Sequence, residues 1–335
     1  MNRETEPFAH ADETALEGQL RPSSLSEFVG QSKVKKQLEV LLQAAQEQNR
    51  VPDHLLFSGP PGLGKTTLAM IVAKETGRAL RVTSGPTIQH AGDLAAILSS
   101  LEHGEILFID EIHRVSRAAE EMLYLAMEDF RVDVMVGKGP GATSVPLDLE
   151  RFTLVGATTR AGMLPNPLRD RFGFTASMEF YDHDELINVL QRAAKVLGVR
   201  LDEDSLQLIA QSSRGTPRVA NRLLRRIRDY AQVQKVSAID AKTTASALEI
   251  YEIDATGLDR LDRQYLSALA ENRQRALGLG TLATRLGEEP ETIEMVVEPY
   301  LLRLGLIERT PKGRLITNSG LESMGIPSES SSLFD

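Results

Sequence analysis

Apolar and polar residues follow each other in the first 181 positions in a way that predicts short strands separated by helices. Apolar residues recur at three- and four-residue spacing in 93–102 and in 116–130, as they do in amphipathic helices. Strands that alternate with helices form a parallel sheet with helices on both faces. The pattern therefore predicts an α/β domain. Segments of strand character lie at 54–58, 78–84, 106–109, 152–157 and 176–180.

The periodicity changes after residue 181. Every periodic segment from there to about residue 253 is helical, which predicts a second, all-α domain. Three short helical stretches then precede two short strands around a Pro/Gly turn in 306–316, an order typical of a winged helix. We expect four parts, which are an acidic tail at 1–18, a large domain at 19–181, a small helical domain at 182–254 and a winged-helix domain at 255–335.

Composition narrows the class of protein. The 335 residues are 41% hydrophobic and 25% charged, which is ordinary for a globular protein. The absence of cysteine excludes disulfides and thiolate metal sites. No apolar run reaches membrane-spanning length and the N-terminus has no signal-peptide pattern, so a cytoplasmic location is expected. The net charge of −9 argues against a chain coated in nucleic acid, although local basic patches remain compatible with it.

A glycine-rich loop between the first predicted strand and a helical stretch carries the clearest chemistry. Its pattern is G-x-x-x-x-G-K-[ST], ending in Lys65 and Thr66. Gly62 and Gly64 let backbone N–H groups point at a phosphate, and the new helix adds its unpaired N–H groups. Lys65 can reach the β- and γ-phosphates, and Thr66 can offer its hydroxyl to Mg²⁺. The loop predicts a nucleoside triphosphate site.

Polar residues at the ends of later strands supply candidate catalytic groups. Asp110 and Glu111 end an apolar strand, where Asp110 can hold the Mg²⁺ shell and Glu111 can polarise the attacking water. A helix cap is the alternative for this pair. Thr158 and Thr159 end another strand, and a hydroxyl there can hold the water or sense the γ-phosphate. An arginine in 167–172 can reach a phosphate of a neighbouring subunit, or else pair with a carboxylate at the surface.

The helical domain contributes an arginine-rich helix. Thr216 and Pro217 predict a helix start, and six arginines occur between 214 and 228 without a carboxylate. A charge run is commonly a solvated face, but six uncompensated arginines in an acidic protein favour an anion. Arg218, at the helix start, is the best candidate to touch the nucleotide.

Taken together, these residues resemble AAA+ ATPases and, within them, the motor subunits that drive branch migration of Holliday junctions in bacteria. The resemblance covers about residues 16–325. It implies a parallel-sheet ATPase domain, an all-α lid domain and a winged-helix head domain. The motifs that carry it are Leu20–Gln31, Gly59–Thr66, Asp110–Glu111, Ala157–Arg160, Arg171 and Gly215–Arg218.

The resemblance also implies an activity and a set of partners. The activity is that of a homohexameric ring that hydrolyses ATP with Mg²⁺ and pulls duplex DNA in recombination and repair. Arg171 acts in trans as an arginine finger, and Thr159 stands where many relatives have a sensor asparagine, which leaves the choice between Thr158 and Thr159 open. The nucleotide contacts that it implies are Leu20, Arg21, Gly62, Gly64, Lys65, Thr66, Thr67, Glu128, Asp129, Phe130, Arg171, Tyr181 and Arg218.

An insertion at 131–149 reads as a hairpin. Val132, Val134 and Val136 alternate with polar residues before a glycine-rich turn at 137–141. An apolar hairpin without an obvious cover suggests a partner protein, and the alternative is a hairpin that lies on its own domain. The resemblance implies docking to the junction-recognition subunit RuvA, and it leaves contact with the resolvase RuvC open.

The winged-helix domain is acidic, and its charge is unevenly placed. The helix in the usual recognition position carries three glutamates, among them Glu298, which would repel phosphates. The wing is basic, and we expect Arg309, Lys312 and Arg314 to hold DNA phosphates without reading sequence. A translocase needs such contacts, because base-specific ones would halt it.

Two other functions share some of these features. A clamp-loader-like ATPase switch has the same ATPase motifs but does not need a winged helix. An ATP-tuned DNA-binding regulator has a basic recognition helix and does not need Glu111. ATPase rates without DNA, with linear duplex and with a four-way junction distinguish the three.

Overall fold

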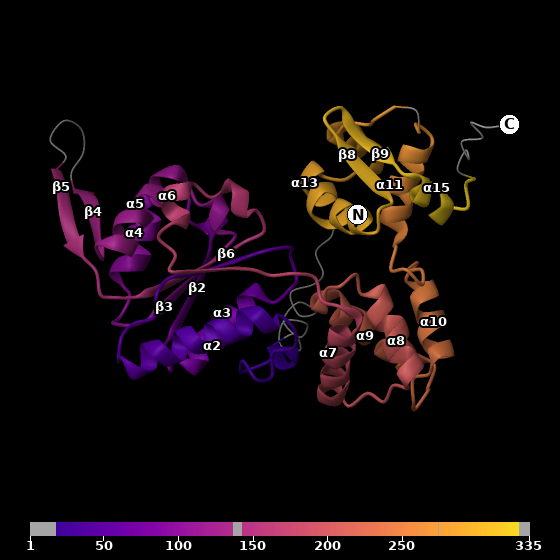
Figure 1. Ribbon diagram of the computed structural model, residues 1–335, viewed down its shortest axis with the longest axis horizontal. Helices are drawn as coiled ribbons and strands as arrows, with labels where there is room; N and C mark the ends of the chain where they lie inside the picture. Colours follow the sequence, from indigo (N-terminus) through magenta and orange to yellow (C-terminus); the bar gives the residue numbers. More distant parts are fainter. Residues whose placement is uncertain (1–17, 137–142, 274, 328–335) are drawn as a thin grey trace, which may run out of the picture. The chain divides into compact units, whose positions relative to one another are not determined.

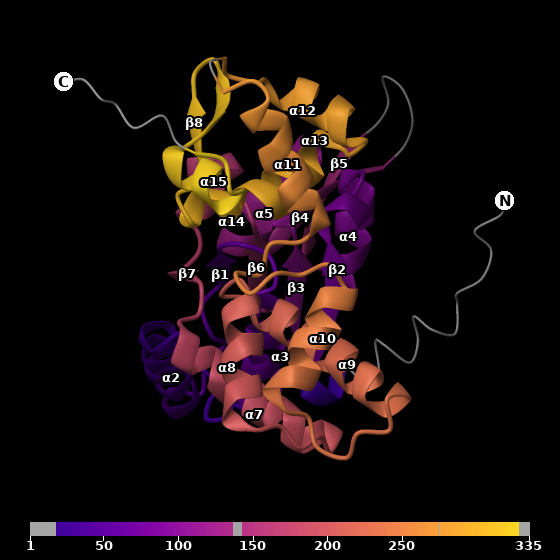
Figure 2. The same ribbon diagram turned by 90° about the vertical axis from the view of Figure 1, so that its right-hand side faces the viewer.

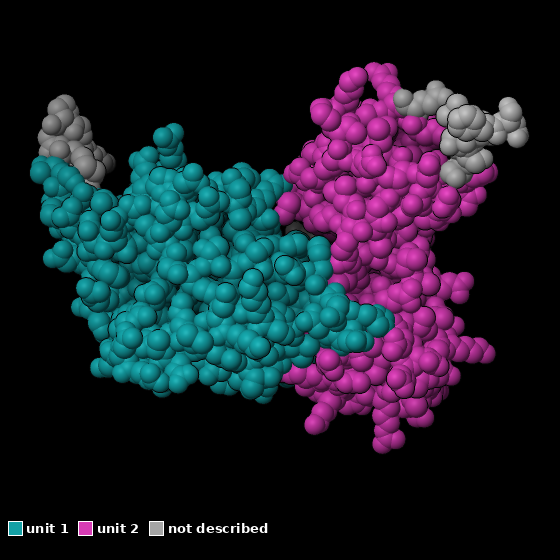
Figure 3. Space-filling model, in the orientation of Figure 1, with its two compact units in different colours: residues 1–185 teal, residues 186–335 magenta. Residues whose placement is uncertain are grey.

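The structure is a computed structural model that describes residues 18–136, 143–273 and 275–327. The chain forms two compact units, residues 1–185 and 186–335, which Figure 3 shows in teal and magenta. The acidic tail predicted at 1–18 lies almost wholly outside the described residues. Within the described part of the chain, no helix has the length and apolar character needed to cross a membrane.

A five-stranded parallel sheet forms the centre of the first unit, as the sequence predicts. The strands β1 and β6 are buried along their whole length, which explains their continuous apolar runs. The last strand begins two residues earlier than predicted, because Phe174–Ser177 is the segment in register with β1. In sheet order the strands are β2 (Leu80–Ser84), β3 (Ile106–Asp110), β6 (Thr153–Thr158), β1 (Leu55–Ser58) and β7 (Phe174–Ser177).

Helices cover both faces of this sheet. On one side lie α2 (Ser32–Glu47) and α3 (Lys65–Glu75), and on the other lie α4 (Ala91–Ser99), α5 (Arg117–Glu128) and the short α6 (Asn166–Arg169) (Figure 1). The main core of the unit packs α4 and α5 against apolar side chains of β3 and β6. This packing confirms the predicted α/β class and leaves the carboxyl ends of the strands for polar residues.

The insertion forms an antiparallel hairpin of β4 (Arg131–Val136) and β5 (Thr143–Asp148), as predicted. Its predicted turn at 137–141 lies outside the described residues. Val132 is buried and Val134 packs against the core of the unit, whereas every residue of β5 is exposed, including the apolar Val145 and Leu147. One strand therefore lies on its own domain while the other presents apolar side chains to solvent.

The second unit contains a helical part followed by a helix-and-hairpin part (Figures 1 and 2). The helical part consists of α7, which begins in the first unit, and three further helices, as the sequence predicts. Its elements are α7 (His183–Leu197), α8 (Glu203–Ser212), α9 (Pro217–Val233) and α10 (Ala241–Ile250).

The C-terminal part has its own core, in which helices α11 and α12 pack against a third helical segment and a hairpin. The third helical segment, predicted at 291–304, contains a π-helical stretch at Ile293–Val297. Pro299 follows it closely, and because proline has no N–H to donate, it disturbs the regular ladder. The elements are α11 (Arg260–Ala270), α12 (Leu279–Leu286), α13 (Pro290–Thr292), α14 (Glu298–Arg303), β8 (Ile307–Thr310), β9 (Gly313–Ile316) and α15 (Asn318–Ser323).

Candidate active site

The glycine-rich loop connects the buried end of β1 to the first residue of α3. Gly59 has φ 130°, and a Cβ there would lie 2.5 Å from the carbonyl oxygen of Met178. Gly64 has φ 103°, and a Cβ there would lie 3.0 Å from the ring of Phe28. Only glycine fits these two positions, so the backbone itself forms the wall of the loop.

Lys65 is nearly buried at the start of α3. Its Nζ donates hydrogen bonds to the carbonyl oxygens of Gly59 (2.7 Å) and Pro60 (2.8 Å). Burial lowers the pKa of Lys65, while the nearby carboxylates of Glu111 and Asp110 oppose that shift. The ammonium is therefore held inside the loop and close to the two predicted catalytic acids.

The neighbouring strands β3 and β6 bring Glu111 and Thr159 together. Glu111 has φ 46°, in the left-handed region, directly after the end of β3. Its Oε2 accepts hydrogen bonds from the Oγ1 (3.0 Å) and the backbone N–H (3.3 Å) of Thr159. Strained residues of this kind cluster at active sites, and Glu111 is held by a threonine at the carboxyl ends of two central strands.

Thr158 has a different environment from Thr159. It is fully buried, its Oγ1 lies 3.0 Å from Nδ1 of His113, and it accepts a hydrogen bond from the N–H of Arg160 (3.0 Å). Of the two threonines, Thr159 is the one that contacts Glu111. This geometry favours Thr159 as the sensor.

His113 is a site residue that was not assigned a role from the sequence. Its Nδ1 lies 3.2 Å from Oε2 of Glu111, and its side chain is only 3% exposed. It occupies the turn after β3, between Glu111 and Thr158. The sequence offers one indication of its role, its position two residues after the Asp110–Glu111 pair, but a lone histidine does not by itself predict a site residue.

Three residues predicted to contact nucleotide within the same chain, Leu20, Arg21 and Tyr181, lie in the first unit. Leu20 is buried, and Nη1 of Arg21 donates to Sδ of Met70 on α3 (3.4 Å). The Tyr181 hydroxyl donates to the carbonyl oxygen of Leu63 (3.3 Å), and burial raises its pKa. Within the first unit, these contacts hold Arg21 beside α3 and Tyr181 against the loop.

The remaining predicted contacts in this unit lie on α3 and at the end of α5. Thr67 is buried and Thr66 is partly exposed, one residue after Lys65. Phe130, with φ 51°, packs edge-on against Phe152, with 5.9 Å between ring centroids. Asp129 ends α5 as its C-cap. None of these placements tests nucleotide contact, so the assignments stay predictions.

Arg171 lies just after α6 and contacts the end of α5. Its Nη1 donates to the carbonyl oxygen of Pro167 (2.7 Å), and its Nη2 lies 2.5 Å from Oε2 of Glu128. Its guanidinium also lies over the ring of Tyr124, 5.4 Å from the centroid. The predicted finger and the predicted Glu128 are therefore neighbours within one chain.

The arginine-rich helix differs from the prediction in its charge balance. Arg214 pairs with Asp259 and Asp262, and Arg228 pairs with the adjacent Asp229, so at least two of the six arginines are compensated. The acids were missed because two of them lie more than 40 residues away in the sequence. Arg218 is exposed as the second residue of α9 in the other unit, and its contact with nucleotide stays a prediction.

The predicted DNA contacts also differ in their surroundings. Glu298 does not face outward to repel phosphates, because its carboxylate is fully buried beneath the wing. Its Oε1 accepts from Nε of Arg314 (2.8 Å), and its Oε2 accepts from Nε of Arg309 (2.6 Å). The two arginines are cross-strand partners that share one carboxylate, while Lys312 is exposed at the turn. Their contact with DNA stays a prediction.

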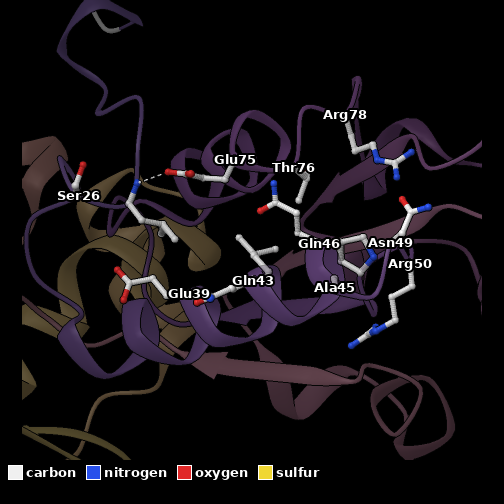
Figure 4. A pocket seen from close by; sticks show the side chains of 13 residues that line it. Ser26, Glu39, Gln43, Ala45, Gln46, Asn49, Arg50, Glu75, Thr76 and Arg78 are labelled. Carbon is white, nitrogen blue, oxygen red and sulfur yellow. Dashed lines mark hydrogen bonds between the residues drawn. The ribbon is translucent and has the colours of Figure 1, made fainter.

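A polar groove of about 550 Å³ lies along α2, away from the glycine-rich loop (Figure 4). Glu39, Gln43 and Arg50 are among the side chains that line it. The backbone N–H of Leu25 donates to Oε1 of Glu75 there (3.1 Å), the bond drawn dashed in Figure 4. This bond ties the 20–31 segment to the end of α3.

Models of protein families match the chain in three consecutive parts. Residues 20–178 match the Holliday junction DNA helicase RuvB P-loop domain, 181–254 the RuvB AAA lid domain, and 255–325 the RuvB C-terminal winged helix domain.

Individual relatives agree with the family models. The chain is 61% identical to the Holliday junction branch migration complex subunit RuvB of Clavibacter michiganensis, covering 96% of this chain and 89% of that protein. It is 59% identical to the subunit of the same name from Thermobifida fusca, covering 96% and 92%. A solved structure of the Thermotoga maritima RuvB Holliday junction branch migration motor matches with a TM-score of 0.85 and 45% identity, covering 92% of this chain and 99% of that one.

Proposed function

The chain belongs to the RuvB family of AAA+ ATPases, and we propose that it is the ATP-driven motor that moves DNA during branch migration of Holliday junctions. The family models cover the P-loop, lid and winged-helix parts in order, which supports a motor that includes its own DNA-binding head. The observation that carries the ATPase assignment is the Glu111–Thr159 contact at the carboxyl ends of β3 and β6, near Lys65 of the loop.

Nucleotide binding follows from the loop, and we assign the steps of hydrolysis to these residues. Lys65 holds the β- and γ-phosphates, Glu111 polarises the attacking water, and Thr159 orients Glu111. Because Gly59 and Gly64 lack the Cβ that would collide with Met178 and Phe28, the loop backbone can keep its positive-φ conformation, which supports a phosphate cradle built from backbone N–H groups. When bound, Mg²⁺ neutralises charge that develops on the phosphates, and Thr66 and Asp110 are the residues placed to hold it.

The donor set fits Mg²⁺ rather than a metal held entirely by the protein. In the described residues, no group of three or more histidines and acids is arranged to hold a metal ion. Mg²⁺ commonly binds one or two protein oxygens together with substrate phosphates and waters. A hydroxyl and one carboxylate beside the loop match that pattern.

We further propose a homohexameric ring in which Arg171 reaches the nucleotide of the adjacent subunit. The exposed β5 strand, with Val145 and Leu147 outward, supports docking of RuvA to the hairpin. A contact with RuvC is a further proposal that no described surface identifies. The proposed DNA substrate implies a cytoplasmic location.

The test replaces Glu111 with glutamine. Because Gln keeps the shape but cannot polarise water as a carboxylate does, the Glu111→Gln protein should bind ATP normally and hydrolyse it far more slowly. The Lys65→Ala protein should lose nucleotide binding itself. Normal turnover by Glu111→Gln would refute the assignment of the base, and equal wild-type ATPase rates with linear duplex and a four-way junction, together with no junction movement, would refute the motor.

A further inference from the structure

One arginine binds the turn before α9 to the C-terminal part of the second unit. Arg214 has φ 56°, and its side chain is 12% exposed. Its Nε donates to the carbonyl oxygen of Gly257 (2.8 Å), and its Nη2 donates to Oδ2 of Asp259 (2.8 Å) and of Asp262 (2.6 Å). Its guanidinium also lies 5.1 Å from the ring centroid of Tyr300. Four groups beyond residue 254 thus surround one guanidinium.

The linker between α10 and α11 is packed against both parts. Gly257 passes so close to α8 that a Cβ there would lie 2.7 Å from the carbonyl oxygen of Ser212. Arg263 of α11 donates to the carbonyl oxygens of Glu252 (2.7 Å) and Leu258 (3.0 Å). A linker fixed in this way is not a free tether, which agrees with the placement of both parts in one compact unit.

The two carboxylates that pair with Arg214 are themselves fixed at the start of α11. Asp262 is 1% exposed, and Asp259 caps α11 by accepting the backbone N–H of Leu261 (2.9 Å) and of Asp262 (3.1 Å). Removing one partner of a buried ion pair is costly because the other charge stays buried without compensation. Arg214 therefore fixes the start of α11 to the start of α9.

The elements that Arg214 connects carry the predicted contacts with nucleotide and with DNA. Arg214 lies four residues before Arg218, the predicted nucleotide contact on α9. On α11, one turn after Asp262, the Tyr265 hydroxyl donates to Glu298 (3.0 Å), which also holds the two wing arginines. A continuous set of described contacts therefore runs from the start of α9, the helix that carries the predicted nucleotide contact, to the wing.

We propose that Arg214 is a positioning residue that joins the lid helices and the winged-helix head into one rigid body, so that a displacement set by nucleotide at Arg218 moves the wing. The part of this inference that concerns nucleotide and DNA rests on the proposed function. Its physical core, a rigid joint at Arg214, does not depend on DNA.

Distance measurements test the joint directly. The chain has no cysteine, so nitroxide labels attached through Lys242→Cys on α10 and Ser319→Cys on α15 report one distance within a subunit when labelled full-length protein is diluted with an excess of unlabelled protein. With Arg214 present, we expect one narrow distribution that is the same with ADP and with a slowly hydrolysed ATP analogue. Arg214→Met should broaden it. An unchanged narrow distribution in Arg214→Met would overturn the proposal.

Matched variants separate the joint from folding and from charge. Arg228→Met removes an arginine of the adjacent helix α9 whose ion pair, among the described residues, is with its exposed neighbour Asp229, so it should leave the distribution narrow. Arg214→Lys keeps the charge but not the forked geometry of the guanidinium, so its distance distribution should be intermediate in width between the wild type and Arg214→Met. Should Arg214→Met fail to fold, Asp262→Asn provides the milder break, and a narrow distribution in that folded variant would count equally against the joint.

Activity measurements complete the test. Arg214→Met should bind nucleotide and duplex as the wild type does, while junction movement falls by about tenfold, the size typical of a lost coupling. Wild-type movement rates in Arg214→Met, measured alongside a broadened distance, would overturn the link to the wing. If instead the wild type moves no junctions but the label distances behave as expected, the proposed function fails and the joint stands.

Discussion

Replacing Glu298 with glutamine tests how the wing is held against the helix that precedes it. Glu298 is fully buried, and its carboxylate accepts hydrogen bonds from Arg309, Arg314 and the Tyr265 hydroxyl. Arg309 and Arg314 face each other across the β8–β9 hairpin, where like charges repel. The Glu298→Gln change keeps the size of the side chain and removes the one negative charge that the two arginines share.

The magnitude follows from the exposure of each partner. Breaking a buried ion pair by removing one member costs about 3–5 kcal/mol. Arg309 is 41% exposed and can regain water, whereas Arg314 is 15% exposed and Tyr265 is buried. Because one of the two arginines is partly solvated, we expect the low end, about 3 kcal/mol.

Hydrogen exchange of the full-length protein measures this loss locally, which matters because a multidomain chain has no single unfolding free energy. Amides of β8 and β9 should exchange about 100-fold faster in Glu298→Gln, the equivalent of about 3 kcal/mol at 1.4 kcal/mol per tenfold change. Glu308→Gln, an exposed change on β8, is the control and should alter exchange little. A loss below about 1 kcal/mol would refute the reasoning, because breaking a buried ion pair should cost about 3 kcal/mol or more.

Duplex affinity measured against salt gives a second result from the same variant. One negative charge against two guanidiniums leaves a net charge of +1, and Glu298→Gln raises it to +2. If Arg309 and Arg314 face DNA phosphates, affinity at low salt should rise and its salt dependence should steepen. An unchanged slope in the folded variant would contradict their placement on DNA.

Two further predictions concern the ATPase domain. Mixing Arg171→Ala with Lys65→Ala subunits should recover ATPase activity, because some interfaces then pair an intact loop with an intact arginine; no recovery at any ratio would contradict a finger supplied in trans. His54 is buried, accepts from the N–H of Leu154 at Nδ1 (2.8 Å) and has its Nε2 3.1 Å from the carbonyl oxygen of Met127, and burial lowers its pKa. The unfolded state therefore binds more protons below pH 6.5, so stability should fall as the pH drops below that value. Thermal unfolding of His54→Gln should show a smaller loss between pH 6.5 and 5, and an equal loss would rule His54 out as the cause.

The parts of the fold that the sequence predicts best are those fixed by local chemistry. The glycine-rich loop needs Gly59 and Gly64 because of positive φ and close contacts, and the buried strands need unbroken apolar runs. These requirements are visible in single segments. The predicted start of β7 differs from the observed one by two residues, because the register of this strand is set by β1, more than 100 residues away in the sequence.

The two predictions about charge that differ from the structure share one physical cause. Glu298 was expected to repel DNA, and the arginines after 213 were expected to be uncompensated, because each was weighed against its neighbours in the sequence. In the fold, Glu298 meets a wing that begins nine residues later, and Arg214 meets acids 45 and 48 residues later. Periodicity identifies the face of a helix, but only tertiary packing identifies the partner.

Arg171, the proposed arginine finger, forms only a weak contact within its own chain. Arg171 pairs with Glu128 in its own subunit, and their side chains are 30% and 61% exposed. Such an exposed pair contributes about 0–1 kcal/mol, so little free energy holds the guanidinium in place. A triphosphate carries several negative charges where Glu128 carries one, and a guanidinium binds phosphate through paired hydrogen bonds. In the proposed ring, the Arg171–Glu128 pair is therefore weak enough for the arginine to exchange Glu128 for a neighbour's phosphate.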